Sequence, residues 1–214
     1  PVRVRQKADD EPRAPAVSVV ACCTSDAGVP VTWAAGRDRP GVFHLDRLDD
    51  NAVARIRAIA GPRREEGDLV VVSVHWGGNW GYDVGTKHRD FAHALIETGA
   101  VDVIHGHSSH HPRPLEVYRD KLILYGCGDF INDYEGIRGH ASFRPTLTLL
   151  YLARFDAETG ALSELRLVPF EISAFRLRRA NNEQSQWLAT TLERENRRVE
   201  GPPLRVTPDG LFIV

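Results

Sequence analysis

The sequence predicts an α/β fold built around a parallel sheet. Three observations support this prediction: Val-rich strand-like segments alternate with helical segments, the connections between them are short, and the strands run into polar loops. A strand–helix–strand order with short connections is typical of a βαβ unit, whose strands pair in parallel. Sheets of this kind bind ligands at the carboxyl ends of their strands, so the polar loops are the first candidates for a site.

Local sequence signals predict each secondary-structure element of the first half of the chain. Residues 1–15 are charged, contain Pro and have no period, which predicts an irregular lead-in. Each predicted helix is preceded by an acidic residue or Thr that can cap it, and it is followed by Gly. The Val-rich runs between the helices are typical of strands. The expected elements are a strand over 16–23, a loop over 24–48, a helix capped by Asp49 or Asp50 and ended by Gly61-Pro62, a strand over 68–75, a helix capped by Thr86 and ended by Gly99, and a strand over 101–104.

The second half changes character and predicts antiparallel pairing. Apolar runs there flank short polar turns, which is the pattern of β-hairpins. We expect one domain over 16–214 that contains both halves. The expected elements are a hairpin of 115–118 with 122–125, a hairpin of 147–155 with 161–172, a short strand over 175–178, a helix over 182–197, and a small hairpin around 208–210.

Composition narrows the class of protein. The chain has 214 residues, enough to bury a core, and its formal charge of −2 argues against a nucleic-acid partner. It contains no apolar stretch of membrane-spanning length and no secretory signal, and its three Cys do not suggest a disulfide framework. It has no Met and begins at Pro1, which fits either processing or a piece of a longer protein. Association with the cell envelope and a cytoplasmic location both stay open.

Two loops hold most of the residues that could carry chemistry. They cover 75–83 and 105–112 and contain five of the nine His residues. Imidazole nitrogens bind Zn, Mn or Fe, and His residues at the tips of two adjacent parallel strands can converge on one ion. The alternative for His75 alone is a hydrogen-bonded structural role. Residues outside this pattern are expected to be surface or packing residues, namely His44, His88, His93 and His140, with Trp76 and Trp80 packing the loops.

Other catalytic patterns are absent from the sequence. It has no GxSxG, GxxxxGK[ST] or GxGxxG motif. Ser108 and Ser109 lie beside His residues, but nothing predicts a nucleophile–base–orienter triad. Cys127 is an alternative thiolate nucleophile, although a buried Cys between glycines is usually inert.

Several motifs together resemble one known family. They are His75-Trp76-Gly77 after a Val-rich strand, Phe91-Ala92 with Leu95-Ile96 and Gly99, Asp102-Val103-Ile104 before Gly106-His107 and His110, Pro114 to Tyr118, Tyr125 with Gly128-Asp129-Phe130, and the earlier Trp33 and Arg39 to Val42. This combination resembles the CapA, or poly-γ-glutamate capsule-synthesis, proteins from about Ala16 to the C-terminus. The resemblance implies a calcineurin-like metallophosphoesterase-type α/β/β/α sandwich.

The resemblance also implies a metal-dependent site. A divalent metal ion (Mn, Fe or Zn) would polarise a phosphoryl or amide-type bond and generate hydroxide. Asp129 or Asp83 would support the ligands from a second layer. The implied roles are metal ligation by His75, His107 and His110, catalysis by His75, His110 and Asp129, and substrate binding by Asn79 and Arg113.

The chain also departs from the family pattern. Ser108 stands where many relatives carry His, and Asn79 stands where an acidic residue is common. The family's upstream ligands, two Asp and an Asn, are not found before His75. We therefore expect the C-terminal portion of a CapA-like protein, lacking its N-terminal part and holding at most one ion weakly.

Two functions follow from these observations, and a third possibility is a truncated chain with no complete activity. The first is an enzyme, or the remnant of one, in capsule, poly-γ-glutamate or cell-envelope polymer biosynthesis, acting on a phosphoester or an anionic polymer. The second is a non-catalytic accessory or scaffold protein that binds an anionic polymer at a degenerate site, where Arg side chains suit carboxylates. Capsule-synthesis membrane proteins are the partners that the resemblance implies.

Overall fold

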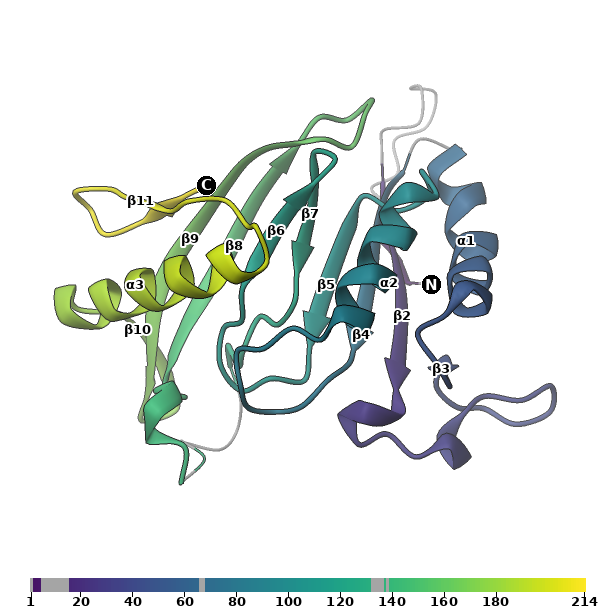
Figure 1. Cartoon of the computed structure of the whole chain (residues 1–214), viewed down its shortest axis with the longest axis horizontal. Coiled ribbons are helices and arrows are strands. Elements are labelled where there is room, and N and C mark those ends of the chain that lie inside the picture. Colours follow the sequence, from purple (N-terminus) through teal and green to yellow (C-terminus); the bar gives the residue numbers. More distant parts are fainter. Residues whose placement is uncertain (1, 5–15, 66–67, 132–136, 138) are drawn as a thin grey trace.

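Two β-sheets, with helices packed on them, make up the part of the chain that the computed structural model describes, residues 2–4, 16–65, 68–131, 137 and 139–214 (Figure 1). Strands follow the order β1-β2-β4-β5-β7-β6 in the first sheet, and β3 pairs with β2. This mixture of parallel and antiparallel pairing confirms an α/β fold. The more specific metallophosphoesterase-type sandwich stays a prediction.

Parallel strands form the centre of the first sheet. Its parallel pairs join β2 (Val17–Thr24), β4 (Leu69–His75), β5 (Val103–His107) and β7 (Lys121–Leu124), and the short β3 (His44–Leu45) runs parallel to β2. Antiparallel strands complete it, with β1 (Val2–Val4) beside β2 and β6 (Leu115–Tyr118) beside β7. The predicted βαβ unit is therefore confirmed.

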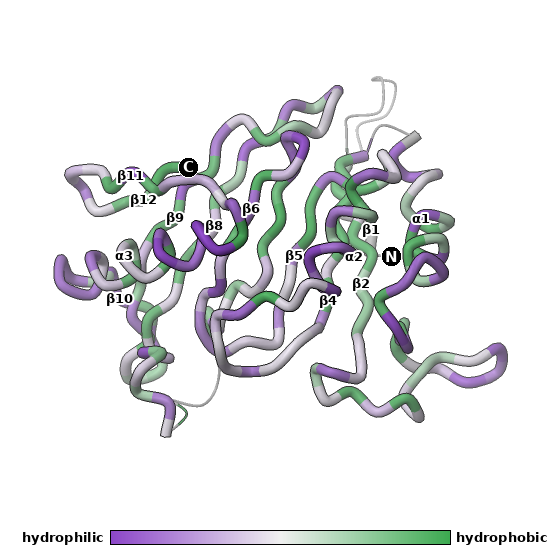
Figure 2. Tube along the Cα trace, viewed as in Figure 1, coloured by the Kyte–Doolittle hydropathy of each residue, from purple (hydrophilic) through white to green (hydrophobic). Residues whose placement is uncertain are grey.

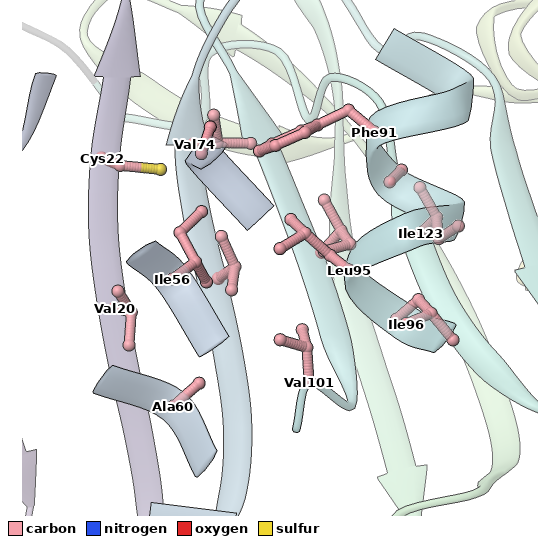
Figure 3. Close-up of a cluster of buried hydrophobic side chains, with 14 of the residues drawn as sticks. Val20, Cys22, Ile56, Ala60, Val74, Phe91, Leu95, Ile96, Val101 and Ile123 are labelled. Carbon is pink, nitrogen blue, oxygen red and sulfur yellow. The ribbon is translucent and has the colours of Figure 1, made fainter. Parts of the chain in front are cut away.

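Two helices cover one face of this sheet. Alternate residues of β4, namely Val70, Val72 and Val74, are fully buried, as expected for the covered face of a pleated strand. They pack with apolar residues of α1 (Asp50–Glu65) and α2 (Thr86–Glu97), among them Ile56 and Leu95 (Figure 3). Burial of these side chains is the main force that holds the helices to the sheet.

The second sheet is antiparallel. Its central strand β9 (Leu162–Ser173) pairs with β8 (Leu147–Phe155), β10 (Arg176–Arg179) and β12 (Phe212–Ile213), and β12 pairs with β11 (Arg205–Val206). Helix α3 (Asn182–Arg198) lies against this sheet and begins with a capping box, in which Asn181 and Gln184 bond each other's backbone N–H groups. The predicted hairpins and C-terminal helix are confirmed within a residue or two.

A second apolar core joins the two sheets. It brings β5, β6 and β7 together with β8, β9 and α3, and the most apolar stretches lie along the strands (Figure 2). The sheets do not close over their whole length: a cavity of about 750 Å³ stays open between them, lined mainly by apolar side chains such as Val71, Val103 and Leu149. His105 is one of the few polar groups in its wall.

Buried carboxylates lie at the amino ends of the central strands. Asp102, just before β5, has 1% of its side chain exposed and accepts hydrogen bonds from Lys121 Nζ (2.5 Å) and the Val70 N–H (2.9 Å). Arg64 Nε lies 3.3 Å from the same carboxylate. Asp68, just before β4, accepts from Ser18 Oγ at 2.6 Å. These carboxylates tie neighbouring strands and α1 together at the end of the sheet opposite the loops of interest.

The prediction that Gly61-Pro62 ends the first helix is wrong. Helix α1 continues through both residues to Glu65, although Pro62 cannot donate its backbone hydrogen bond. Arg64 anchors the last turn, since its guanidinium contacts Asp102 and donates to the Glu158 carbonyl at 2.9 Å. These tertiary contacts offset the local cost of the proline.

Two smaller boundaries also differ. The second helix is capped by Gly85, and Thr86 is its first residue rather than its cap. The strand predicted over 101–104 is β5, which starts at Val103 and extends to His107 because it pairs with β4 as far as His75. His105 to His107 therefore belong to a strand and not to a loop.

The segments expected to be irregular contain short elements. In the lead-in predicted over 1–15, Val2–Val4 form β1 beside β2, and the other residues lie outside the described part of the chain. The loop predicted over 24–48 contains two 3-10 turns, Ser25–Ala27 and Val31–Trp33, as well as β3. Among the described residues, none of the helices combines the length and the apolar character that a membrane crossing requires.

Candidate functional site

The site lies at the carboxyl edge of the first sheet, where β4 and β5 end side by side (Figure 1). The parallel register places His75 directly opposite His107 and Ser73 opposite His105. Because side chains alternate along a strand, all four project from the face that looks toward the second sheet. The structure brings together His75 and His107, two of the histidines predicted at consecutive strand tips, and whether they share a metal ion stays a prediction.

The His75 and His107 rings face each other through their Nδ1 atoms, which are 3.1 Å apart. One of these nitrogens must donate and the other accept, so at most one of the two Nδ1 atoms carries a hydrogen. Burial, with smaller contributions from His105 and His75, lowers the pKa of His107 to about 4. His107 is therefore neutral at pH 7, which is the form that binds metal ions.

His110 lies in a separate hydrogen-bonded group. Its Nδ1 is 3.0 Å from the Asp129 carboxylate, and its Nε2 is 3.3 Å from the Asn79 side-chain amide nitrogen. The backbone N–H of His110 also donates to the Asn79 carbonyl at 3.0 Å. Since a carboxylate accepts and an amide NH₂ donates, Nδ1 carries the hydrogen and Nε2 is the basic nitrogen. Three predicted site residues thus come together.

Ser108 joins the two loops. Its hydroxyl donates to the Gly77 carbonyl at 2.9 Å and lies 3.4 Å from Asn79 Oδ1. Its φ is 127°, a conformation that residues other than Gly rarely adopt. Ser108 therefore holds the second loop against the first.

Asp26 and His88 belong to the same edge, although the sequence analysis placed neither there. Asp26 follows β2 directly and accepts from the Gly77 N–H at 3.2 Å, from Thr24 Oγ1, and from His88 Nε2 at 2.8 Å. Burial alone would raise the pKa of Asp26, but these hydrogen bonds and the neighbouring His88 outweigh it and lower the pKa. The available signal was the Ser25-Asp26 pair, which lies one residue beyond the strand predicted over 16–23.

Arg113 lies beside the first loop. Its Nη1 is 3.3 Å from the position that a Cβ on Gly77 would occupy. Its Nε is buried and has no hydrogen-bond partner within the described ranges. Burial lowers the pKa of Arg113, while Asp83 and Asp26 oppose that shift. Asp83 itself is exposed and pairs with Arg198 at 3.2 Å, so it does not support a His ligand here.

The remaining candidates have packing roles. Trp76 is buried, with 2% of its surface exposed, and its indole N–H donates to the Tyr125 carbonyl at 3.1 Å. Trp80 stacks on His140, with ring centres 3.9 Å apart. Burial raises the pKa of Cys127 to about 12, so its thiol is protonated at pH 7 and is not a thiolate nucleophile.

Comparisons with known proteins identify the family. The family model described as bacterial capsule synthesis protein PGA_cap matches residues 10–134, more than half of the chain. The chain belongs to this capsule synthesis family. The resemblance to CapA proteins noted in the sequence is thereby confirmed.

Relatives of the capsule synthesis family have names that agree with this assignment. A probable polyglutamine synthesis accessory protein of Mycobacterium tuberculosis is 46% identical over 199 residues, which are 92% of this chain and 52% of that protein. The PGA biosynthesis protein CapA of Bacillus subtilis is 39% identical over 101 residues, 47% of this chain and 25% of that protein. The capsule biosynthesis protein CapA of Bacillus anthracis is 30% identical over 99 residues, 46% of this chain and 23% of that protein. The chain spans about half the length of the mycobacterial relative.

Two histidine nitrogens of this capsule-family site lie as close together as two ligands of one metal ion do. Two imidazole nitrogens bound to one ion at about 2.0–2.1 Å lie roughly 3.0–3.4 Å apart. The 3.1 Å between His75 Nδ1 and His107 Nδ1 agrees with that spacing. Within the part of the chain that the structure describes, no three His, Cys, Asp or Glu side chains are grouped as one ion requires. The three-histidine site with His110 therefore stays a prediction.

His111 should make the stability of this capsule-family chain depend on pH. Its side chain is fully buried, and that burial, together with Arg113 and His110, lowers its pKa to about 4. Between about pH 6.5, where an unfolded His titrates, and pH 4, the unfolded chain binds the extra proton, so stability falls as pH falls. We expect urea unfolding of the metal-free protein to show a His111 contribution of up to about 1.4 kcal/mol per pH unit.

The matched variant for this measurement is His111→Phe. A phenyl ring keeps the contacts with the neighbouring Phe143 and Tyr82 rings but cannot take up a proton. Its stability should fall less steeply between pH 6 and pH 4 than that of the wild type. Equal slopes for the two proteins would show that His111 does not titrate differently on unfolding.

Proposed function

We propose that this chain acts in the synthesis of a capsule or polyglutamate-type polymer through a metal-dependent, hydrolase-type site at the carboxyl edge of the first sheet. The observation that supports the proposal is the pair of His75 and His107 nitrogens, which face each other 3.1 Å apart on adjacent strand ends. These two side chains would hold one divalent ion. With two protein ligands, the ion would be weakly bound and would keep open positions for water or substrate.

A bound ion would polarise a phosphoryl or amide-type oxygen and lower the pKa of a water molecule. The protein's own contribution is proton handling by His110. Asp129 accepts the Nδ1 hydrogen of His110, so Nε2, which accepts from the Asn79 amide, is the basic nitrogen that would take up a proton. Asn79 and Arg113 border the same loops and would orient an anionic substrate.

Metal titration tests this proposal. Calorimetric titration of the chain with Zn²⁺ and with Mn²⁺ should detect one weak site. Removing a residue that hydrogen-bonds a metal ligand typically weakens metal affinity roughly 10- to 100-fold. His75→Ala and His107→Ala each remove a proposed ligand itself, so each should weaken metal affinity at least as much. His110→Ala should change metal affinity little but abolish metal-dependent hydrolysis of a model phosphodiester.

His93→Gln is the matched control. His93 lies on α2, bonded to Glu116 at 2.8 Å and outside both loops, and glutamine keeps a donor for that carboxylate. The control should bind metal like the wild type. Unchanged metal affinity in both His75→Ala and His107→Ala would contradict the proposed site.

A second candidate function is a non-catalytic accessory role in which the same edge binds an acidic polymer. The buried Nε of Arg113, which has no hydrogen-bond partner among the described residues, favours it, since such a guanidinium nitrogen suits an incoming carboxylate. Polymer binding without metal, unchanged in His75→Ala and lost in Arg113→Ala, would select this candidate over the hydrolase.

A further inference from the structure

The cavity between the two sheets is open because the second sheet ends before the first one does. Among the described strands, β8 pairs only with β9, so it forms an edge of the second sheet. The first sheet continues past β7 through β5 and β4 to β2, which lie progressively farther from β8 (Figure 1). Each of these four strands contributes to the cavity wall, through residues such as Val17, Val71, Val103 and Leu122. The face of the first sheet opposite α1 and α2 is therefore uncovered beyond β8.

The backbone of β8 is free along this edge. In an antiparallel pair, residues that exchange hydrogen bonds alternate with residues that do not. The Ile172 N–H of β9 donates to the Thr146 carbonyl, just before β8, at 2.7 Å. Every second residue from there onward bonds β9, so Leu149, Tyr151 and Ala153 point their N–H and C=O groups the other way. No described residue bonds these outward-pointing groups.

The same residues of β8 form one wall of the cavity. Leu149, Tyr151 and Ala153 all line it. A strand added beside β8 would lie about 4.7–4.9 Å from it within the second sheet and about 10 Å from the first sheet. Its backbone would bond the free groups of β8, and every second side chain would enter the cavity opposite Val71 and Val103.

The cavity wall suits apolar side chains. Apart from His105, which has Ser73 Oγ within 3.1 Å, its one titratable acid or base is Asp156 among the described acidic and basic side chains other than Cys and Tyr. The Asp156 carboxylate already accepts the Thr159 N–H at 2.8 Å. An incoming charged side chain would therefore find no partner of opposite sign in this wall.

Strand β8 also lacks the usual protection of an exposed edge. Natural proteins protect such strands with charged residues, Pro or very short length. The first seven of the nine residues of β8 contain no charge and no Pro, and Leu152 is 49% exposed. A long, apolar edge of this kind is typical of a strand that pairs with a further segment.

A second copy of this chain does not fit this edge. Two β8 strands paired antiparallel would be related by a two-fold axis perpendicular to the second sheet. Both first sheets would then lie on the same face of the joined sheet. Each of them already reaches past its own β8, so the two would occupy the same space.

We propose that the free edge of β8 accepts an extended strand with an apolar residue at every second position, supplied by the same polypeptide in the longer proteins of this capsule family. About half of the mycobacterial relative lies outside the region that this chain matches, so such proteins have the length to supply it. Main-chain hydrogen bonds would hold the strand, and the cavity would select its alternate side chains. This interaction does not involve the proposed metal site.

Peptide binding to the whole 214-residue chain tests the inference. The probes are overlapping, fluorescently labelled peptides of about 15 residues, longer than an ordinary strand, which together span the unmatched half of the mycobacterial relative. One peptide, or neighbours that share a segment, should bind, as measured by fluorescence anisotropy. Binding should slow amide hydrogen exchange at Leu149, Tyr151 and Ala153, and it should leave Leu150 and Leu152, which already bond β9, nearly unchanged.

Ala153→Pro is the disrupting variant, because it removes a free N–H and leaves the β8–β9 bonds in place. It should bind the same peptide about tenfold more weakly. Ala153→Thr keeps the N–H, and threonine suits a strand, so this control should bind within about twofold of the wild type. Circular dichroism checks that both variants fold, and the exchange pattern of the wild type decides the question if the proline variant does not.

Three results would overturn the inference: no peptide of that half binds, binding leaves the exchange of the three amides unchanged, or a folded Ala153→Pro binds as the wild type does. A dimer seen in sedimentation and abolished by Ala153→Pro would also overturn it, because a second copy would then occupy the edge.

Discussion

Replacing Asp102 by alanine is expected to destabilise the fold by about 3–5 kcal/mol, the usual cost of removing one member of a buried ion pair. The carboxylate is almost completely buried and serves Lys121, Arg64 and the Val70 N–H at once. Without the carboxylate, the Val70 N–H of β4 has no hydrogen-bond partner. Lys121 also donates to the Thr159 carbonyl, so the turn of the β8–β9 hairpin loses one of its supports when Lys121 is no longer held by Asp102. We expect strand pairing at this end of the first sheet to weaken most.

Urea unfolding at pH 7 measures this effect. Asp90→Ala is the control, because Asp90 is exposed on α2 and its replacement should change stability by no more than about 0.5 kcal/mol. Asp102→Asn keeps the shape and one acceptor and should fall between the two. If Asp102→Ala unfolds at the same urea concentration as Asp90→Ala, the buried network does not stabilise the fold.

Adding a single methyl group at Gly106 should cost about 1–3 kcal/mol or more, as overpacking of a rigid core does. A Cβ there would lie 2.6 Å from the carbonyl oxygens of Leu124 and Tyr125 and from the indole nitrogen of Trp76. Backbone atoms of β7 cannot move away without breaking the β5–β7 pairing. Because Gly106 separates His105 from His107, the Gly106→Ala variant should also displace His107 and weaken any metal binding.

Thermal unfolding of Gly106→Ala compares this cost with a matched glycine. Gly61→Ala adds the same methyl group within α1, where nothing lies within 4 Å of it, and alanine there favours the helix by up to about 1 kcal/mol. The Gly106 variant should melt well below the wild type and the Gly61 variant at or above it. A Gly106→Ala protein as stable as the wild type would mean that β5 and β7 can separate at low cost.

Local sequence patterns were sufficient to predict the βαβ unit that β4, α2 and β5 form. The Val-rich run before His75 and the Gly-terminated helix after it predicted a parallel partner strand and histidines at adjacent strand ends. The register that pairs His75 with His107 came only from the structure, because the second strand was predicted to end at residue 104. The pairing of Ser108 with Gly77, by contrast, depends on a backbone conformation that no local pattern indicates.

Contacts between distant segments set the limits of the sequence prediction. The contact of Asp26 with His88 joins residues 62 positions apart, and each of them alone resembles an ordinary surface residue. Helix α1 continues beyond Pro62 because Arg64 in its last turn contacts Asp102, which lies just before β5. The separation of His110 from the His75–His107 pair likewise arises from Asp129 and Asn79, which reach it from two other loops.

The two ends of the first sheet have different roles, so substitutions at the two ends should differ in their effect on stability. The carboxylates that secure the strands, Asp68 and Asp102, lie at one end, and the histidines lie at the other. Substitutions of exposed loop residues at the histidine end, away from the buried Gly106 and Trp76, should therefore cost little stability. A laboratory selection for a new anionic substrate should therefore succeed more readily at exposed positions of these loops than near Asp102.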